Sequence, residues 1–127
     1  MVLVDTSSWI HMLRTDGDRK VRARVESLLE AGKACWCPMI RLELWRGAGE
    51  RDRRILLDFE RHLLELPISN DVWNLACTLA NKARKAGATV PASDILIAAC
   101  AKFHSVELEH SDSDFDRLAS VQIRFGN

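Results

Sequence analysis

The sequence has no net charge and no long apolar stretch, and these two absences exclude several classes of protein. Its 18 basic and 18 acidic residues give a formal charge of zero over 127 residues. Nucleic-acid binding would therefore need a local basic patch rather than an overall positive charge. No run approaches the roughly 20 apolar residues that cross a bilayer, and only four apolar residues precede Asp5. We expect no membrane segment and no secretion signal, and hence a cytoplasmic protein.

Paired cysteine motifs and phosphate-binding loops are absent as well. The cysteines are Cys35, Cys37, Cys77 and Cys100, with no CxxC pair and no histidine spacing that completes a zinc set. Neither GxxxxGK nor GxGxxG occurs, which argues against nucleotide binding. No histidine has a serine or cysteine partner in a recognisable nucleophile motif. The sequence therefore predicts neither structural zinc nor a disulfide nor a hydrolase triad.

The residues that are present predict one folded α/β domain spanning 1–127. Hydrophobic residues make up 47% and charged residues 28% of the chain, as in globular proteins. Short apolar runs predict strands at 1–5, 33–38, 62–68, 105–111 and 121–125. Helical periodicity and capping residues predict helices at 18–31, 38–48, 50–62, 71–86 and 91–103. This alternation indicates an α/β sandwich with a mainly parallel sheet.

The stretch MVLVDTSSWI ends a strand on a carboxylate. In parallel α/β sheets, ligands bind in the crevice at the carboxyl ends of the strands. Asp5 is therefore expected at the edge of a site. Ser7 or Ser8 is expected to cap the helix that Trp9 begins to bury.

Carboxylates occur in three further segments, and each can be interpreted either as part of the site or as purely structural. Glu43 in MIRLELWRG either lies beside an apolar helix face and belongs to the site, or lies at the solvated edge of that face. Asp94 lies in the first turn of an almost wholly apolar helix, where it either abuts other structure at the site or is simply stabilised by the helix dipole. Asp112 and Asp114 follow the fourth strand, where they either border the same crevice as Asp5 or only form a cap or turn. If the carboxylates converge at one end of the sheet they repel each other, and a bound Mg²⁺ or Mn²⁺ would relieve that repulsion.

Four segments, MVLVDTSSWI, RLELWRG, PASDILIAACAKFHS and HSDSDFDRL, resemble in order the signature segments of the PIN domain family. The resemblance is closest to the toxin ribonucleases of VapBC toxin–antitoxin pairs. It implies a three-layer sandwich around a five-stranded, mainly parallel sheet and a metal-dependent endoribonuclease. The acidic quartet would be Asp5, Glu43, Asp94 and Asp112, with Asp5 and Asp94 as the principal metal ligands. Asp114 is the alternative fourth acid.

The resemblance also implies a mechanism and partners. Water activated by Mg²⁺, with Mn²⁺ as the alternative, would hydrolyse RNA phosphodiester bonds. Thr6 would support Asp5 or a water at the metal, and Arg46 and Arg84 would contact RNA. The expected partners are a second copy of the chain and a cognate VapB-type antitoxin. The antitoxin would dock on the apolar helices at 38–46 and 55–59.

One departure from the family pattern and several alternatives remain open at this point. Glu107 and Glu109 are unusual in a central strand, so either one face of the sheet is more open or Glu109 adds a carboxylate near the site. Dehalogenase-type phosphatases need a second Asp where Ser7 stands, and receiver domains need an acidic pair and a lysine that are not evident. A non-catalytic PIN-like module that binds RNA or protein is the alternative function.

Overall fold

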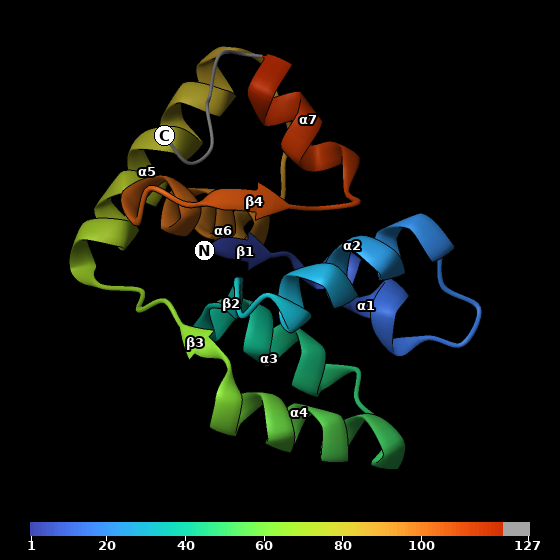
Figure 1. Cartoon of the computed structure of the whole chain (residues 1–127). Coiled ribbons are helices and arrows are strands. Elements are labelled where there is room, and N and C mark those ends of the chain that lie inside the picture. The colour runs from blue at the N-terminus through green and yellow to red at the C-terminus, as the bar shows by residue number, and fades with distance from the viewer. Residues whose placement is uncertain (121–127) are drawn as a thin grey trace.

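The computed structural model describes residues 1–120, which form a parallel sheet and the helices around it (Figure 1). The strands are β1 (Val2–Val4), β2 (Ala34–Trp36), β3 (Leu64–Glu65) and β4 (Glu107–Glu109). The helices are α1 (Thr6–Leu13), α2 (Arg19–Glu30), α3 (Pro38–Arg46), α4 (Glu50–His62), α5 (Asn70–Lys85), α6 (Ala92–Phe103) and α7 (Ser113–Ser120). The α/β prediction is confirmed. The fifth strand, predicted at 121–125, lies outside the described residues.

The sheet has the strand order β3-β2-β1-β4, and each neighbouring pair is parallel. Val2 is in register with Ala34 of β2 and with Glu107 of β4. The backbone N–H of Asp5 continues the β1–β4 pairing by donating to the carbonyl oxygen of Glu109 at 2.9 Å. The first and fourth strands therefore end side by side, although about a hundred residues separate them in sequence.

Helices cover the sheet from both sides. Side chains alternate between the two faces of a strand, and Val2 and Glu109 share a hollow with Arg24 and Leu28 of α2. Helix α2 therefore lies against that face. Helix α6 runs beside β1 and β4 and packs along α5 (Figure 1). Eight consecutive residues of α6, from Asp94 to Ala101, are buried, which agrees with its nearly continuous apolar sequence.

Local sequence explains most helix boundaries. Asp18 caps α2, accepting hydrogen bonds from the backbone N–H groups of Lys20 at 2.9 Å and Val21 at 3.0 Å. Gly32 follows α2 with φ of 67°, a left-handed conformation that favours glycine. The prediction that Ser7 or Ser8 caps α1 is wrong. The N-cap is Asp5, because its carboxylate reaches the free N–H group of the first turn.

An aromatic cluster joins α1, β2 and α4. The ring of Phe59 on α4 lies 4.9 Å from that of Trp9 and 6.0 Å from that of Trp36, centroid to centroid. Trp9 and Trp36 are almost completely buried, and such aromatic pairs stabilise a core beyond the area they bury. All four cysteines are free thiols. Within residues 1–120, no helix has the length and apolar character needed to cross a membrane.

Candidate active site

Asp5 is the innermost acidic residue at the carboxyl end of the sheet. Its side chain is 2% exposed. Oδ2 accepts hydrogen bonds from the backbone N–H of Ser7 at 3.1 Å and from its hydroxyl at 2.6 Å. Oδ1 is buried and has no hydrogen-bond partner within residues 1–120. Burial raises the pKa of Asp5; the two bonds from Ser7 and the backbone N–H of Thr6 lower it, and the charge of Asp112 raises it further.

Glu43 reaches the same area from α3. Its Oε1 accepts a hydrogen bond of 2.8 Å from the hydroxyl of Thr6, the residue that follows Asp5. Burial of this half-buried side chain raises its pKa, and the bond from Thr6 partly offsets that rise. The charges of Asp5 and Asp112 also raise this pKa, whereas Arg46 lowers it. Glu43 is thus within electrostatic range of both strand-end aspartates.

Three further carboxylates form a tight group. Asp94, Asp112 and Asp114 each place one oxygen so that all three oxygens lie within 4.8 Å of one another. The pKa of Asp94 is raised to about 8, mainly by burial, then by a hydrogen bond with Asp114 and by the charges of Asp112 and Asp5. Asp94 therefore holds a proton near neutral pH as long as no cation is bound.

Backbone and side-chain contacts order the segment that carries Asp112 and Asp114. The backbone N–H of Asp114, in the first turn of α7, donates to Oδ1 of Asp112 at 2.9 Å, so the Asp112 carboxylate caps the start of the helix. Arg117, one turn further along α7, forms an ion pair with Oδ1 of Asp114 at 2.8 Å and donates to the carbonyl oxygen of Thr89 at 3.1 Å. Asp114 thus has a cationic neighbour, so its charge is already partly balanced.

The structure therefore brings all four acids of the predicted quartet, and Asp114 with them, to one end of the sheet. Asp5 lies between β1 and α1, Glu43 in α3 and Asp94 in α6, whereas Asp112 precedes α7 and Asp114 lies in its first turn. Oxygen ligands of this kind suit Mg²⁺ or Mn²⁺, which tolerate few direct protein ligands. The buried Oδ1 of Asp5, which has no hydrogen-bond partner within residues 1–120, and the raised pKa of Asp94 both fit a cation-binding site.

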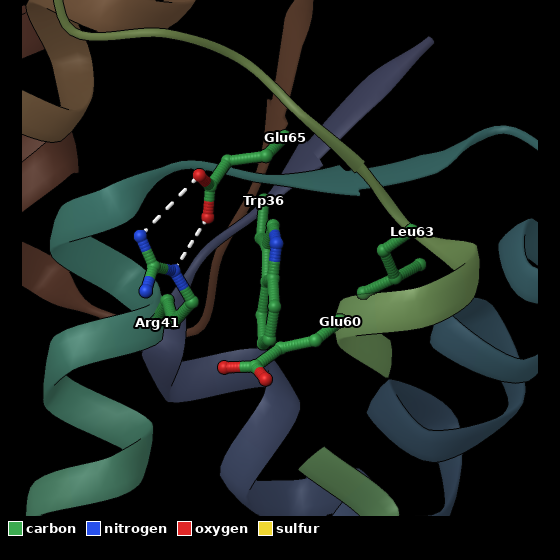
Figure 2. Close-up of a pocket in the computed structure, with 5 residues that line it drawn as sticks. All are labelled: Trp36, Arg41, Glu60, Leu63 and Glu65. Carbon is green, nitrogen blue, oxygen red and sulfur yellow. Dashed lines mark hydrogen bonds and ion pairs between the residues drawn. The ribbon is translucent and has the colours of Figure 1, made fainter. Parts of the chain in front are cut away.

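A separate pocket lies at the opposite edge of the sheet and contains none of these acids. It measures about 280 Å³. Figure 2 shows Trp36 between Glu60 and an ion pair formed by Arg41 and Glu65. The Nε of Arg41 lies 2.6 Å from Oε1 of Glu65. Arg41 and Glu65 pair with each other, and Glu60 accepts a hydrogen bond of 3.0 Å from the indole N–H of Trp45, so this pocket is not the candidate active site.

Comparisons with known proteins agree with this geometry. The model of the PIN domain family matches residues 2–121. The VapC ribonuclease Mb1587 of Mycobacterium bovis is 35% identical over 128 residues, covering 95% of this chain and 93% of that protein. Ribonuclease VapC11 of Mycobacterium tuberculosis matches with the same identity and coverage. The chain belongs to the PIN domain family.

Solved structures share the fold of this PIN domain. The VapBC complex of Salmonella typhimurium bound to DNA aligns with a TM-score of 0.77 at 20% identity, over 92% of this chain and 91% of that one. FitAcB of Neisseria gonorrhoeae aligns with a TM-score of 0.72 at 21% identity, over 100% of this chain and 97% of that one. At these identities the likeness concerns the fold.

The two predicted RNA-contacting arginines lie in different surroundings on the PIN domain. Arg46, exposed at the end of α3, is close enough to Glu43 to lower its pKa. Arg84, exposed on α5, borders a hollow of about 330 Å³ together with Thr89 and Ile95, the residue after Asp94. Arg46 is thus directly beside the acids, whereas Arg84 lies beside the start of the helix that carries Asp94.

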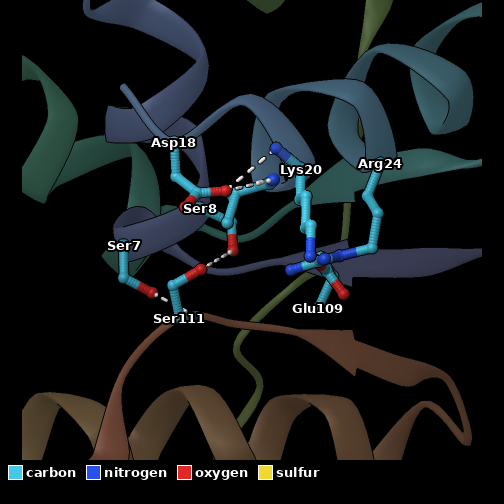
Figure 3. A network of polar contacts seen from close by, with 8 residues as sticks. Ser7, Ser8, Asp18, Lys20, Arg24, Glu109 and Ser111 are labelled. Atoms are coloured by element: carbon cyan, nitrogen blue, oxygen red, sulfur yellow. Dashed lines mark hydrogen bonds and ion pairs between the residues drawn. The ribbon is translucent and has the colours of Figure 1, made fainter. Parts of the chain in front are cut away.

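The contacts of Thr6 and Glu109 bear on points that the sequence left open. The hydroxyl of Thr6 binds Glu43, and the hydroxyl that binds Asp5 belongs to Ser7. The carboxylate of Glu109 pairs with Arg24 of α2, with Nε and Oε1 2.6 Å apart (Figure 3). This favours the interpretation that Glu107 and Glu109 occupy a more open face of the sheet.

Sequence reasoning missed two residues of the PIN domain site, Ser111 and Arg117. Ser111 donates its backbone N–H to the hydroxyl oxygen of Ser7 at 3.0 Å, and its hydroxyl lies 3.2 Å from that of Ser8 (Figure 3). Arg117 follows Asp114 by three residues, a spacing that places both on one helix face and could have been noticed. Nothing in the sequence signals the contacts of Ser111, because they depend on the pairing of β1 with β4.

Proposed function

We propose that this chain, a single PIN domain spanning 1–127, is a metal-dependent endoribonuclease and the toxin of a type II toxin–antitoxin pair. The observation that carries the proposal is that Asp5, whose buried Oδ1 has no hydrogen-bond partner within residues 1–120, lies within electrostatic range of the group formed by Asp94, Asp112 and Asp114. Identity of 35% to proteins named VapC ribonucleases supports the same activity. We also propose the cytoplasm as its compartment, because RNA and the antitoxin would be met there.

The residues of the site fit a divalent cation. In the proposal, Asp5 supplies Oδ1, Asp94 and Asp112 supply further oxygens, and Glu43 and Asp114 contribute directly or through water. Burial, and then mutual repulsion, raises the pKa of Asp5, Glu43 and Asp94, and a bound cation would offset both effects. Mg²⁺ is the proposed ion and Mn²⁺ the alternative, since both favour oxygen ligands.

The chain's own residues have distinct parts in the proposed reaction. Bound Mg²⁺ would neutralise the scissile phosphate and make water a better nucleophile. Glu43, oriented by Thr6, accepts the proton of the attacking water. The water oxygen bonds to phosphorus, the bond from phosphorus to the 3′-oxygen breaks, and that oxygen takes up a proton. The products are a 5′-phosphate and a 3′-hydroxyl.

Arginines outside the acidic group would hold the RNA. Arg46 lies beside Glu43, and its charge lowers the pKa of that residue. In the proposal it contacts a phosphate next to the scissile one. Arg84 would contact the strand further along, beside the start of α6. Contacts to phosphates supply affinity that does not depend on base sequence.

The proposed protein partners are a VapB-type antitoxin and a second copy of the chain. The solved structures with this fold include complexes titled VapBC. On this chain, Leu42 of α3 and Leu57 of α4 are 60% and 49% exposed, which supports these helices as the antitoxin-docking surface. Trp73 of α5, at 52% exposure, offers an apolar contact for a homodimer.

The experiment is cleavage of a mixed RNA pool by purified protein in Mg²⁺, in Mn²⁺ and in excess chelator. The proposal predicts metal-dependent cleavage that leaves 5′-phosphate ends, detected by ligation to an adaptor that requires them. Cleavage that persists in chelator would contradict the metal mechanism. Binding of RNA without cleavage in either metal would instead support the non-catalytic module.

A further inference from the structure

We propose that Ser7 is a positioning residue of the acidic site, which selects the oxygen of Asp5 that faces the metal and fastens the segment carrying Asp112 to β1. The inference rests on the proposed metal site and deepens it. Ser7 is the second residue of α1, and its hydroxyl contacts both Asp5 and the backbone of Ser111.

The direction of the two hydrogen bonds at Ser7 follows from the donors and acceptors available. A backbone N–H can only donate, so the bond of 3.0 Å from Ser111 uses a lone pair of the Ser7 hydroxyl oxygen. A serine hydroxyl has one proton, which is then directed to Oδ2 of Asp5 at 2.6 Å. The contact with Ser111 therefore fixes the orientation of the hydroxyl that holds the Asp5 carboxylate.

The two oxygens of Asp5 consequently have different roles. Oδ2 accepts both the N–H and the hydroxyl of Ser7, while Oδ1 is buried without a hydrogen-bond partner among the described residues. Bonds to a carboxylate are shorter and stronger than those between neutral groups. Ser7 thus immobilises the Asp5 side chain and leaves Oδ1 as the oxygen whose lone pairs are available to a cation.

The same hydroxyl joins two segments that are far apart in sequence. The backbone bond from Asp5 to Glu109 is the last between the ends of β1 and β4. Beyond it, Ser111 is held by Ser7 through its N–H and by Ser8 through its hydroxyl (Figure 3). Asp112 comes directly after Ser111, so these contacts fix its backbone relative to Asp5.

Loss of the Ser7 hydroxyl should weaken metal binding more than it weakens the fold. Side chains that orient metal ligands typically change metal affinity about tenfold to a hundredfold when they are removed. We expect Ser7→Ala to raise the dissociation constant for Mn²⁺ by about tenfold or more, and Ser7→Thr, which keeps the hydroxyl, to stay within about threefold of the wild type. In cleavage assays, saturating Mn²⁺ should restore most of the activity of Ser7→Ala.

The experiment is calorimetric titration of Mn²⁺ into the full chain and its variants, with thermal unfolding in chelator as the check on folding. Thr78→Ala is the matched control, because it removes an exposed hydroxyl on α5 whose single hydrogen bond within residues 1–120 goes to the carbonyl oxygen of Asn74. If Ser7→Ala does not fold, Ser7→Cys replaces it, since a thiol leaves no cavity at this position but is a weak donor.

The outcomes separate this inference from the proposed function. Mn²⁺ affinity of Ser7→Ala within about twofold of the wild type, when Asp94→Asn has lost binding, would overturn the role of Ser7 alone. Equal losses in Ser7→Ala and Ser7→Thr would also overturn it, because packing and not the hydroxyl would then matter. Absence of Mn²⁺ binding by the wild-type chain would overturn the proposed metal site itself.

Discussion

Thr6 on α1 and Glu43 on α3 are joined by a hydrogen bond of 2.8 Å from the Thr6 hydroxyl to Oε1 of Glu43. The two residues are 37 positions apart in sequence. Adjacent hydroxyls at the start of α1 therefore serve different carboxylates, with Thr6 bound to Glu43 and Ser7 bound to Asp5. The first turn of α1 orients two of the four proposed catalytic acids.

Replacement of Thr6 by Ala should lower the rate of RNA cleavage. A hydrogen bond to a charged group contributes about 1.5–3 kcal/mol, and the lower end applies here because Glu43 is only half-buried. We expect kcat/KM to fall about tenfold in Thr6→Ala and to recover in Thr6→Ser. The measurement is cleavage of a fluorescent RNA under single-turnover conditions. Unchanged cleavage by Thr6→Ala would show that Glu43 needs no support from Thr6.

The stability of the metal-free protein should decrease as pH rises from about 4 to about 8. The pKa of Asp94 is raised from 3.8 to about 8 in the folded chain, so the folded state binds this proton more tightly than the unfolded state does. The resulting stabilisation is complete below the unfolded pKa and is lost as pH rises through the folded value. Asp5 and Glu43, whose pKa values are also raised, act in the same direction.

Asp94→Asn should remove much of this pH dependence. In chelator at pH 8 we expect the variant to be more stable than the wild type by about 1–2 kcal/mol. Urea unfolding of both proteins between pH 5 and pH 9 measures the difference. A wild-type stability that stays constant over this range, or a variant that follows the wild type, would contradict the predicted protonation of Asp94.

Glu109→Gln should leave both the fold and the metal site almost unchanged. The carboxylate of Glu109 pairs with Arg24, whose side chain is 51% exposed against 20% for Glu109. Ion pairs near the surface contribute about 0–1 kcal/mol. We expect a loss of stability within that range and an unchanged affinity for Mn²⁺, measured by urea unfolding and calorimetry. A marked loss of Mn²⁺ affinity would show that Glu109 belongs to the acidic site.

Arg46→Ala should weaken RNA binding in a salt-dependent manner. Loss of one phosphate contact is expected to reduce affinity about threefold to tenfold and to lower the salt slope by about one unit. Fluorescence anisotropy with RNA at several salt concentrations measures both values. Lys33→Ala is the matched control, because exposed Lys33 precedes β2 and so lies at the opposite end of the strand from the acids. Equal effects of the two substitutions would exclude a specific role for Arg46.

Features set by local sequence were predictable. The periodicity of residues 71–86 places Val72, Leu75, Ala76, Leu79 and Ala83 on one face of α5, and the structure buries four of them fully and Leu75 partly. Pro91 and the apolar run after Asp94 likewise predicted α6 and its burial. The position of Asp5 after a short apolar run indicated that a parallel strand ends there, and in the structure β1 ends at Val4, directly before Asp5.

Features that depend on which strands are neighbours were not predictable. Ser7 meets Ser111 across 104 positions of sequence because β4 pairs with β1, and no local pattern indicates that pairing. The prediction that Ser7 or Ser8 caps α1 is wrong for a related reason, because the contacts of these serines depend on residues that are distant in sequence. Ser7 and Ser8 are good capping residues, but their hydroxyls bind Asp5 and Ser111, and the Asp5 carboxylate caps the helix instead.

Cleavage of RNA by Asp94→Asn is the most direct test of the metal site. Wild type and variant would be compared at equal concentration in Mg²⁺ and in chelator, with circular dichroism to verify that the variant is folded. We predict that wild-type cleavage requires Mg²⁺ and that the variant is slower by at least about a hundredfold. Cleavage by folded Asp94→Asn at the wild-type rate, or wild-type cleavage that continues in chelator, would contradict a metal-dependent ribonuclease built on these carboxylates.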